Sequence, residues 1–182
     1  MNRFFHIIRL RIFFLLTLSF FVLKEETLFA QKSITKESRK EIIKLPSTGS
    51  YKVIKIKDGD TFVILVNQTP LTVRFAHVDC PEKKQDFGNR AKEFVSQRAF
   101  GKNIHLLHNN QYDSHGRLIA EIILEDGTNL NKELVRNGLA WHFKKYSTSK
   151  VYAALEMQAR KQKIGVWSMP NPIAPWEWRR MK

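Results

Sequence analysis

Cysteine is almost absent from this sequence of 182 residues, and acidic residues are scarce beside basic ones. The single cysteine, Cys80, excludes an intramolecular disulfide and a cysteine-rich zinc site. There are 17 Asp and Glu residues against 31 Lys and Arg residues, which gives a formal net charge of +14 at pH 7. A hydrophobic content of 43% excludes a disordered or collagen-like chain. We therefore expect a globular protein whose first candidate partners are polyanions, either nucleic acid or an anionic membrane surface.

A hydrophobic run long enough to cross a membrane is also missing. Residues 12–23 are apolar except Thr17 and Ser19, but a membrane helix needs about 20 such residues. Three arginines precede this run and Ala30 follows it, an order typical of a secretory signal peptide. We predict that residues 1–30 are removed and that the protein is exported, to the periplasm or as a secreted protein. The alternative is an uncleaved signal anchor, the only case in which we expect contact with a membrane.

The rest of the chain reads as a polar linker, residues 31–50, followed by a single domain, residues 51–182. Apolar runs bounded by turn residues predict five strands, at 51–56, 61–66, 71–78, 103–108 and 117–124. Amphipathic patterns predict three helices, around 91–99, at 129–137 and at 149–163. The last pattern predicts that Val151, Ala154, Leu155 and Ala159 face inward. Five short strands with three helices indicate a β-rich α+β fold, for which the five-stranded OB-fold barrel is the best-known solution.

Three of the few acids lie where predicted strands end: Asp60, Asp79 and Glu82. If the fold brings them together, their carboxylates repel one another unless a cation joins them. Hard divalent cations prefer oxygen ligands, and Ca²⁺ tolerates irregular geometry. Two ordinary Asp-containing turns would equally account for these residues.

Two arginines favour a catalytic interpretation of the acids. Arg74 lies within an apolar strand and Arg117 opens another. Either could form a structural salt bridge. Together with a metal they could instead stabilise the extra negative charge of a phosphodiester-hydrolysis transition state, while Glu82 accepts a proton from the attacking water.

The order and spacing of several short motifs resemble the staphylococcal nuclease (thermonuclease) family from about Tyr51 to Arg180. The matching segments include Asp58-Gly59-Asp60-Thr61, Val73-Arg74-Phe75, Val78-Asp79-Cys80-Pro81-Glu82, Gly138-Leu139-Ala140-Trp141 and Pro175-Trp176-Glu177-Trp178-Arg179. The resemblance implies an OB-fold barrel with three helices. It also implies a Ca²⁺-dependent phosphodiesterase that acts on DNA and RNA, prefers single strands and leaves 3′-phosphate ends.

The resemblance further assigns roles to individual residues. Asp60 and Asp79 would be direct Ca²⁺ ligands, and the backbone carbonyl of Cys80 would be a third. Glu82 would be the general base, while Arg74 and Arg117 would clamp the scissile phosphate. We expect a nuclease of low sequence specificity that acts as a monomer without a stable protein partner.

Two other functions stay open on the sequence alone. A non-catalytic OB-fold protein would bind nucleic acid without cleaving it, and a basic membrane-surface protein would be retained by residues 12–23. Neither gives the acidic residues a purpose. The basic pair Arg179-Arg180 could contact phosphate or could simply be solvated.

Overall fold

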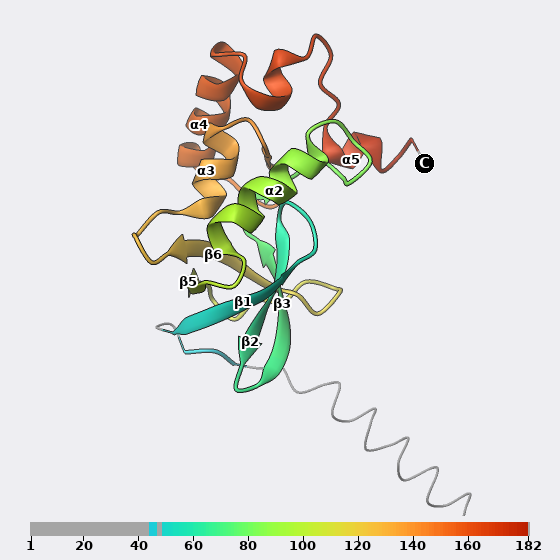
Figure 1. Ribbon diagram of the computed structural model, residues 1–182. Coiled ribbons are helices and arrows are strands. Elements are labelled where there is room, and N and C mark those ends of the chain that lie inside the picture. Colours follow the sequence, from blue (N-terminus) through green and yellow to red (C-terminus); the bar gives the residue numbers. More distant parts are fainter. Residues whose placement is uncertain (1–43, 47–48, 182) are drawn as a thin grey trace, which may run out of the picture. The chain divides into compact units, whose positions relative to one another are not determined.

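Five strands close into a barrel in the order β1-β2-β3-β6-β5 (Figure 1). Their bounds are Ser50–Ile56 (β1), Thr61–Val66 (β2), Thr69–Phe75 (β3), Asn103–Leu107 (β5) and Leu118–Leu124 (β6). Neighbouring strands are antiparallel, except that β3 runs parallel to β6. This architecture confirms the predicted five-stranded barrel.

The computed structural model describes residues 44–46 and 49–181. The fold lies in the unit Leu45–Lys182. The predicted signal peptide and most of the predicted linker fall outside the described residues, so both stay predictions. Within the described part of the chain, no helix is long and apolar enough to span a membrane.

The barrel interior is filled by large apolar side chains from alternating strand positions. Phe62 on β2 and Phe75 on β3 meet edge to face with ring centroids 4.9 Å apart, and both are almost fully buried. Val73 on β3, Ile104 on β5, and Leu118 and Ile122 on β6 are fully buried as well. Side chains on a strand point alternately to opposite faces, so β5 and β6 each present one buried face to this interior. The packed barrel also gives a rigid wall on which polar side chains can be held.

The predicted strand at 71–78 is wrong in one respect, because it is two strands separated by a turn. Pairing of β3 with β6 ends at Phe75, and the backbone then turns at His77, whose φ is 68°. The next two residues, Val78–Asp79 (β4), pair with Trp141–His142 (β7) outside the barrel. The turn brings Asp79 back toward Arg74, which a continuous strand would have carried away from it.

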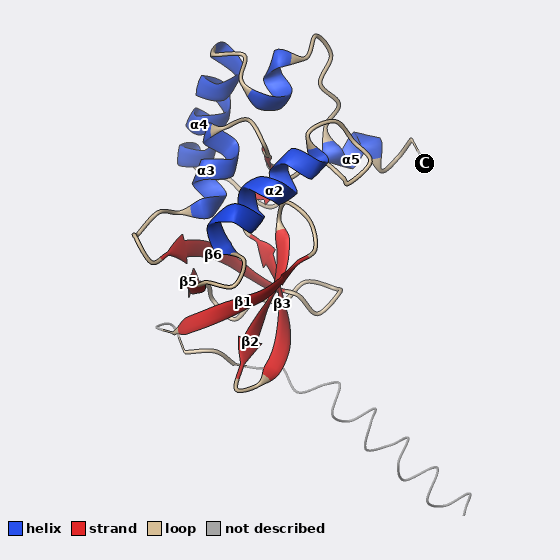
Figure 2. Cartoon of the chain, viewed as in Figure 1, coloured by secondary structure: helices blue, strands red, loops and turns tan. Residues whose placement is uncertain are grey.

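The three predicted helices are present as Gly88–Ala99 (α2), Leu130–Arg136 (α3) and Lys150–Lys161 (α4) (Figure 2). A 3₁₀ turn, Gly165–Ser168 (η1), and a short helix, Pro175–Trp178 (α5), follow them.

The predicted inner face of α4 is wrong in part: Val151 is 53% exposed, Ala154 is exposed as well, and Tyr152 and Glu156 are buried. These two polar side chains are tolerated inside because Tyr152 donates to Glu121 (2.7 Å) and Glu156 pairs with basic residues.

A second, smaller core holds the C-terminal part of the chain. Trp141 and Trp167 meet edge to face at 4.9 Å, and Ala159, Val166 and Ala174 fill the space around them. Phe87, Ile164, Met169 and Trp176 pack against this cluster from outside. The cluster joins the residues before α2 to the C-terminal segment, and Figure 1 shows α5 beside the loop that leads into α2.

Candidate active site

The turn between β1 and β2 places the first carboxylate at the barrel wall. Asp58 accepts a hydrogen bond from the backbone N–H of Asp60 (3.2 Å), and Thr61 donates its hydroxyl to Asp60 Oδ1 (3.2 Å). Gly59 lies between them, where a Cβ atom would fall 2.7 Å from that of Ala91 on α2. Only glycine allows this close approach, so the turn is pressed against the helix and Asp60 is fixed, with 6% exposure.

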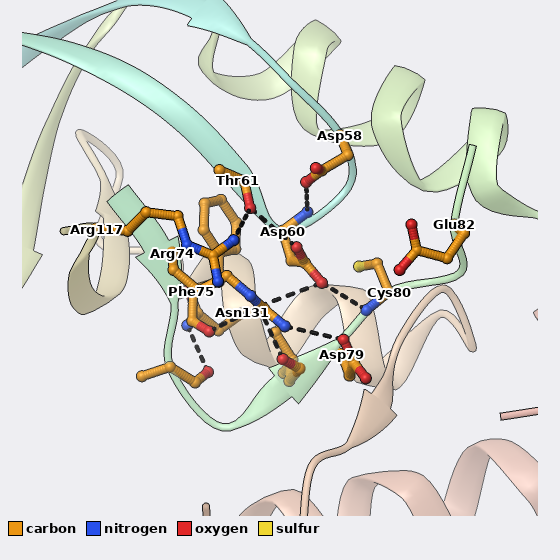
Figure 3. Close-up of polar contacts among 12 residues, drawn as sticks. Asp58, Asp60, Thr61, Arg74, Phe75, Asp79, Cys80, Glu82, Arg117 and Asn131 are labelled. Atoms are coloured by element: carbon orange, nitrogen blue, oxygen red, sulfur yellow. Dashed lines mark hydrogen bonds and ion pairs between the residues drawn. The ribbon is translucent and has the colours of Figure 1, made fainter. Parts of the chain in front are cut away.

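Arg74 joins the two buried aspartates. Its Nη1 lies 3.2 Å from Asp60 Oδ2 and its Nη2 lies 2.9 Å from Asp79 Oδ1, as Figure 3 shows. The same Nη1 also donates to the carbonyls of Phe75 (3.1 Å) and Val78 (2.9 Å), on either side of the β3–β4 turn. The guanidinium therefore sets the geometry of the turn and holds both carboxylates at one place.

Asn131 on α3 fixes the turn from the opposite side. Its fully buried side chain donates to the carbonyls of Ala76 (2.9 Å) and Ala120 (3.2 Å) and accepts from the N–H of Ile122 (3.0 Å). Asn131 thus links the turn that follows β3 to strand β6. Sequence reasoning gave Asn131 no role here, because its partners come from two other segments of the chain, the β3–β4 turn and β6.

Burial and mutual repulsion mark this group of carboxylates as electrostatically strained. Burial, with Asp60 adding to it, raises the pKa of Asp58 to about 6. Burial also raises the pKa of Asp79, although the hydrogen bond from Arg179 works against that rise. A further positive charge at this place would favour the ionised carboxylates.

Cys80 lies directly against Asp60. Its backbone N–H donates to Asp60 Oδ2 at 2.6 Å, and burial raises the pKa of its thiol well above the ordinary value. The thiol is thus a neutral, buried group with 4% exposure for the residue. The main-chain N–H of Cys80 is thus its contact with Asp60, and the carbonyl role that the resemblance implies stays a prediction.

Glu82 and Arg117 reach the site from two loops. Glu82 follows β4, and its backbone is held by Gln85, whose side chain accepts from the Glu82 N–H (3.1 Å). Arg117 donates from Nε to Asp113 Oδ2 (2.6 Å) and from Nη1 to the Thr61 hydroxyl (3.4 Å). Hydrogen bonds from Arg117 lower the pKa of Asp113 despite the partial burial of that carboxyl. The guanidinium of Arg117 is therefore held beside Thr61, the residue that follows Asp60 in the chain.

All six predicted site residues line one open cavity of about 1240 Å³. The structure thus brings together Asp60, Arg74, Asp79, Cys80, Glu82 and Arg117, although their roles stay predictions. The same cavity is lined by aromatic side chains, including Tyr112, Phe143 and Tyr146. Tyr146 is 70% exposed, so its ring is available to a ligand.

Arg179 is a site residue that sequence reasoning left among solvated or phosphate-contacting side chains. It lies 2.8 Å from Asp79 Oδ2 and 2.7 Å from Glu82 Oε1, one hundred residues away from the former in sequence. The signal in the sequence was the Pro-Trp-Glu-Trp run before it, which begins a helix with proline and offers aromatic rings for docking.

The donor atoms fit a hard cation. The buried acidic side chains offer oxygen only, and Ca²⁺ accepts carboxylate, carbonyl and water oxygens. Among the described residues, no group of three or more His, Cys, Asp or Glu side chains is arranged to hold a metal ion. The predicted set needs only two carboxylates, because its third ligand is a backbone carbonyl. A cavity with this donor set and three guanidinium groups is suited to a phosphate ester and its developing negative charge.

Comparison with known proteins yields nucleases. The family described as staphylococcal nuclease homologue matches residues 72–169. An "Uncharacterized endonuclease" of Escherichia coli O157:H7 is 35% identical over 131 residues, which cover 72% of this chain and 85% of that protein. A "Micrococcal nuclease" of Shigella flexneri is 34% identical over 151 residues, 76% of this chain and 86% of that protein. A "Staphylococcal-like nuclease CAN1" of Arabidopsis thaliana is 32% identical over 110 residues, 60% of this chain and 33% of that protein.

Proposed function

Because the chain belongs to the staphylococcal nuclease homologue family, we propose that it cleaves DNA and RNA in a Ca²⁺-dependent reaction of low sequence specificity. The observation that carries the proposal is the pair of buried aspartates, Asp60 and Asp79, joined by Arg74 at one wall of the cavity. Buried carboxylates are costly unless positive charge offsets them, and the single charge of Arg74 lies between two aspartates, so a bound cation would supply the charge that is still needed.

Asp60, Asp79 and the carbonyl of Cys80 would hold Ca²⁺. When bound, the ion supplies positive charge beside the scissile phosphate. Two carboxylates are a small set of charged ligands, so we expect affinity of about 10⁻⁴–10⁻³ M, as in extracellular calcium modules.

The chain's own residues then accept the proton and stabilise the developing negative charge. Glu82 accepts a proton from the water whose oxygen attacks phosphorus, while the P–O5′ bond breaks in line with that attack. Arg117 and Arg74 neutralise the phosphate oxygens as negative charge grows on them, and Arg74 also keeps both aspartates oriented beside the phosphate. The departing O5′ takes up a proton from solvent and Glu82 returns its proton to solvent, so the products carry a 3′-phosphate and a 5′-hydroxyl. We expect single strands to be preferred, because an extended backbone and unstacked bases fit an OB-fold surface with exposed aromatic rings.

The function is tested with single-stranded DNA and RNA, each with Ca²⁺ or with a chelator. Cleavage should require Ca²⁺, and Glu82→Gln should lower kcat by about 10²–10⁴-fold, the contribution of a positioned general base. Glu125→Gln removes the same charge from an exposed turn and serves as the control. Salt-sensitive binding without cleavage by the wild-type protein would instead favour a non-catalytic binding protein.

Export is a further part of the proposal and rests on residues 1–30 alone. The order of arginines, apolar residues and Ala30 supports removal of this segment. Amino-terminal sequencing of protein recovered from the periplasm and the medium tests it. A chain that begins at Met1 and stays with the membrane fraction contradicts it.

A further inference from the structure

Arg179 occupies the oxygens that a cation would need. Asp79 is contacted on both sides, at Oδ1 by Arg74 (2.9 Å) and at Oδ2 by Arg179 (2.8 Å). The second nitrogen of the Arg179 fork, Nη1, reaches Glu82 Oε1 (2.7 Å). Arg179 therefore links a proposed metal ligand to the proposed general base.

The backbone that carries Arg179 is docked, while its side chain is 43% exposed. Gln85, two residues before Phe87, donates to the carbonyl of Ile173 (2.5 Å), and Trp176 stacks on Phe143 with centroids 5.6 Å apart. These contacts place α5 at the edge of the cavity. A long, half-exposed side chain on a fixed helix end is able to change its partner without any movement of the backbone.

The balance of charge favours such a change of partner. Asp58, Asp60, Asp79 and Glu82 carry four negative charges when ionised, and Arg74 with Arg179 supplies only two positive ones. A divalent cation together with Arg74 supplies three, so the acids then hold Arg179 less strongly. An approaching phosphate brings new negative charge to the same cavity, and a guanidinium fork pairs with phosphate as well as with carboxylate.

We propose that Arg179 is a third substrate-binding arginine, which neutralises Asp79 and Glu82 in the cation-free protein and turns to the substrate phosphate when a cation binds. The proposal rests on the proposed Ca²⁺ site. It makes Arg179 a competitor of the cation and a partner of the nucleic acid. A purely structural arginine would have neither of these opposite effects.

The test uses the full chain and two titrations: Ca²⁺ alone by calorimetry, and a single-stranded phosphorothioate tetranucleotide by fluorescence anisotropy at saturating Ca²⁺. Arg179→Gln should tighten Ca²⁺ binding about three- to fivefold, the size of effect expected when partly exposed ion pairs no longer compete with the cation. It should weaken oligonucleotide binding about tenfold or more, since a charge-assisted bond to phosphate is lost. Arg180→Gln is the matched control, because Arg180 is exposed and does not line the cavity. It should change each constant less than about twofold, as expected of an isolated surface charge.

The outcomes separate the two proposals. Failure of the wild-type protein to bind Ca²⁺ contradicts the proposed function itself. Normal Ca²⁺ binding that Arg179→Gln leaves unchanged overturns the role of Arg179 alone. Weaker binding of both ligands, with a lower melting temperature, shows a structural arginine and also overturns the proposal. Arg179→Lys, which keeps the charge but not the fork, should restore competition with Ca²⁺ and leave oligonucleotide binding weak.

Discussion

The barrel and the C-terminal segment both deliver charged groups to one cavity, but they hold them in different ways. Asp60, Arg74 and Asp79 are fixed by strand pairing, by the close approach at Gly59 and by Asn131, and all three are largely buried. Arg179 is carried by a four-residue helix that is docked through aromatic packing and one side-chain hydrogen bond. The barrel thus supplies charges with fixed partners, and the C-terminal segment supplies a charge that can change its partner.

Among the variants that test this comparison, the largest effect should come from removing a fixed positive charge from the barrel side of the cavity. Arg117→Ala deletes a guanidinium held by Asp113 and Thr61 at the cavity wall. We expect kcat to fall by about 10²–10³-fold, the usual effect of losing one group that stabilises transition-state charge. The melting temperature should change little, because Arg117 is not part of the core. Single-turnover rates on single-stranded DNA measure the effect, and Arg98→Ala on α2, outside the cavity, is the control. A fall in kcat no larger than that of the control contradicts the phosphate role.

The second effect should be a loss of stability when the side chain that supports the β3–β4 turn is removed. Asn131→Ala leaves the carbonyl of Ala76 and the N–H of Ile122 without their side-chain partner. Each buried group left unsatisfied costs about 1–3 kcal/mol, so unfolding should become easier by roughly 2–4 kcal/mol. Urea denaturation measures it, with exposed Asn89→Ala as the control. Unchanged stability would mean that the turn is held by Arg74 alone.

The strands, the charged cluster and Asn131 differ in how far the sequence could predict them. The five strands were predictable because apolar runs bounded by turn residues are a local property of the sequence. Asp60 and Asp79 were predictable as neighbours because they stand at strand ends, where a barrel gathers side chains. Arg74 drew attention for another reason, as a charged residue within an apolar strand. Asn131 carries no such pattern, since its three partners lie in other segments.

The remaining differences have equally physical causes. The β4–β7 pair has two residues in each strand, too few for any periodicity to be visible. The buried face of α4 was assigned from apolar residues, yet the protein buries Tyr152 and Glu156 with satisfied polar atoms. The position of Arg179 depends on how the second core docks α5, which is set by packing between residues as distant as Phe87 and Trp176.

A test of the C-terminal segment compares two glycines. Gly138 and Gly127 both have positive φ, 63° and 82°, but only Gly138 lies against another backbone, that of Ile164 and Gly165. Gly127→Ala should cost about 1–2 kcal/mol, the strain of a left-handed alanine. Gly138→Ala adds steric overlap that displaces the η1 region, so it should cost more and should also weaken oligonucleotide binding through α5. Equal losses in the two variants, measured by urea denaturation, would show that the contact between Gly138 and Gly165 does not hold the segment.

The smallest effect concerns the pH dependence of stability near the junction of the two regions. His142 on β7 is buried, and burial lowers its pKa below the ordinary 6.5, although Glu156 opposes the shift. Lys144 and His77 act in the same direction as burial, and Ser147 is its hydrogen-bond partner (2.9 Å). As the pH falls below 6.5, the unfolded chain therefore binds a proton at this residue before the folded protein does. Stability decreases through that window and stops decreasing once folded His142 is protonated.

His142→Asn should remove this part of the decrease, which we expect to be less than about 1 kcal/mol between pH 6.5 and 5.5. The free energy of unfolding at several pH values measures it, and His105→Asn on the exposed side of β5 is the control. If the slope in that window is the same for both variants and the wild type, His142 is not the group that couples protonation to unfolding at this junction.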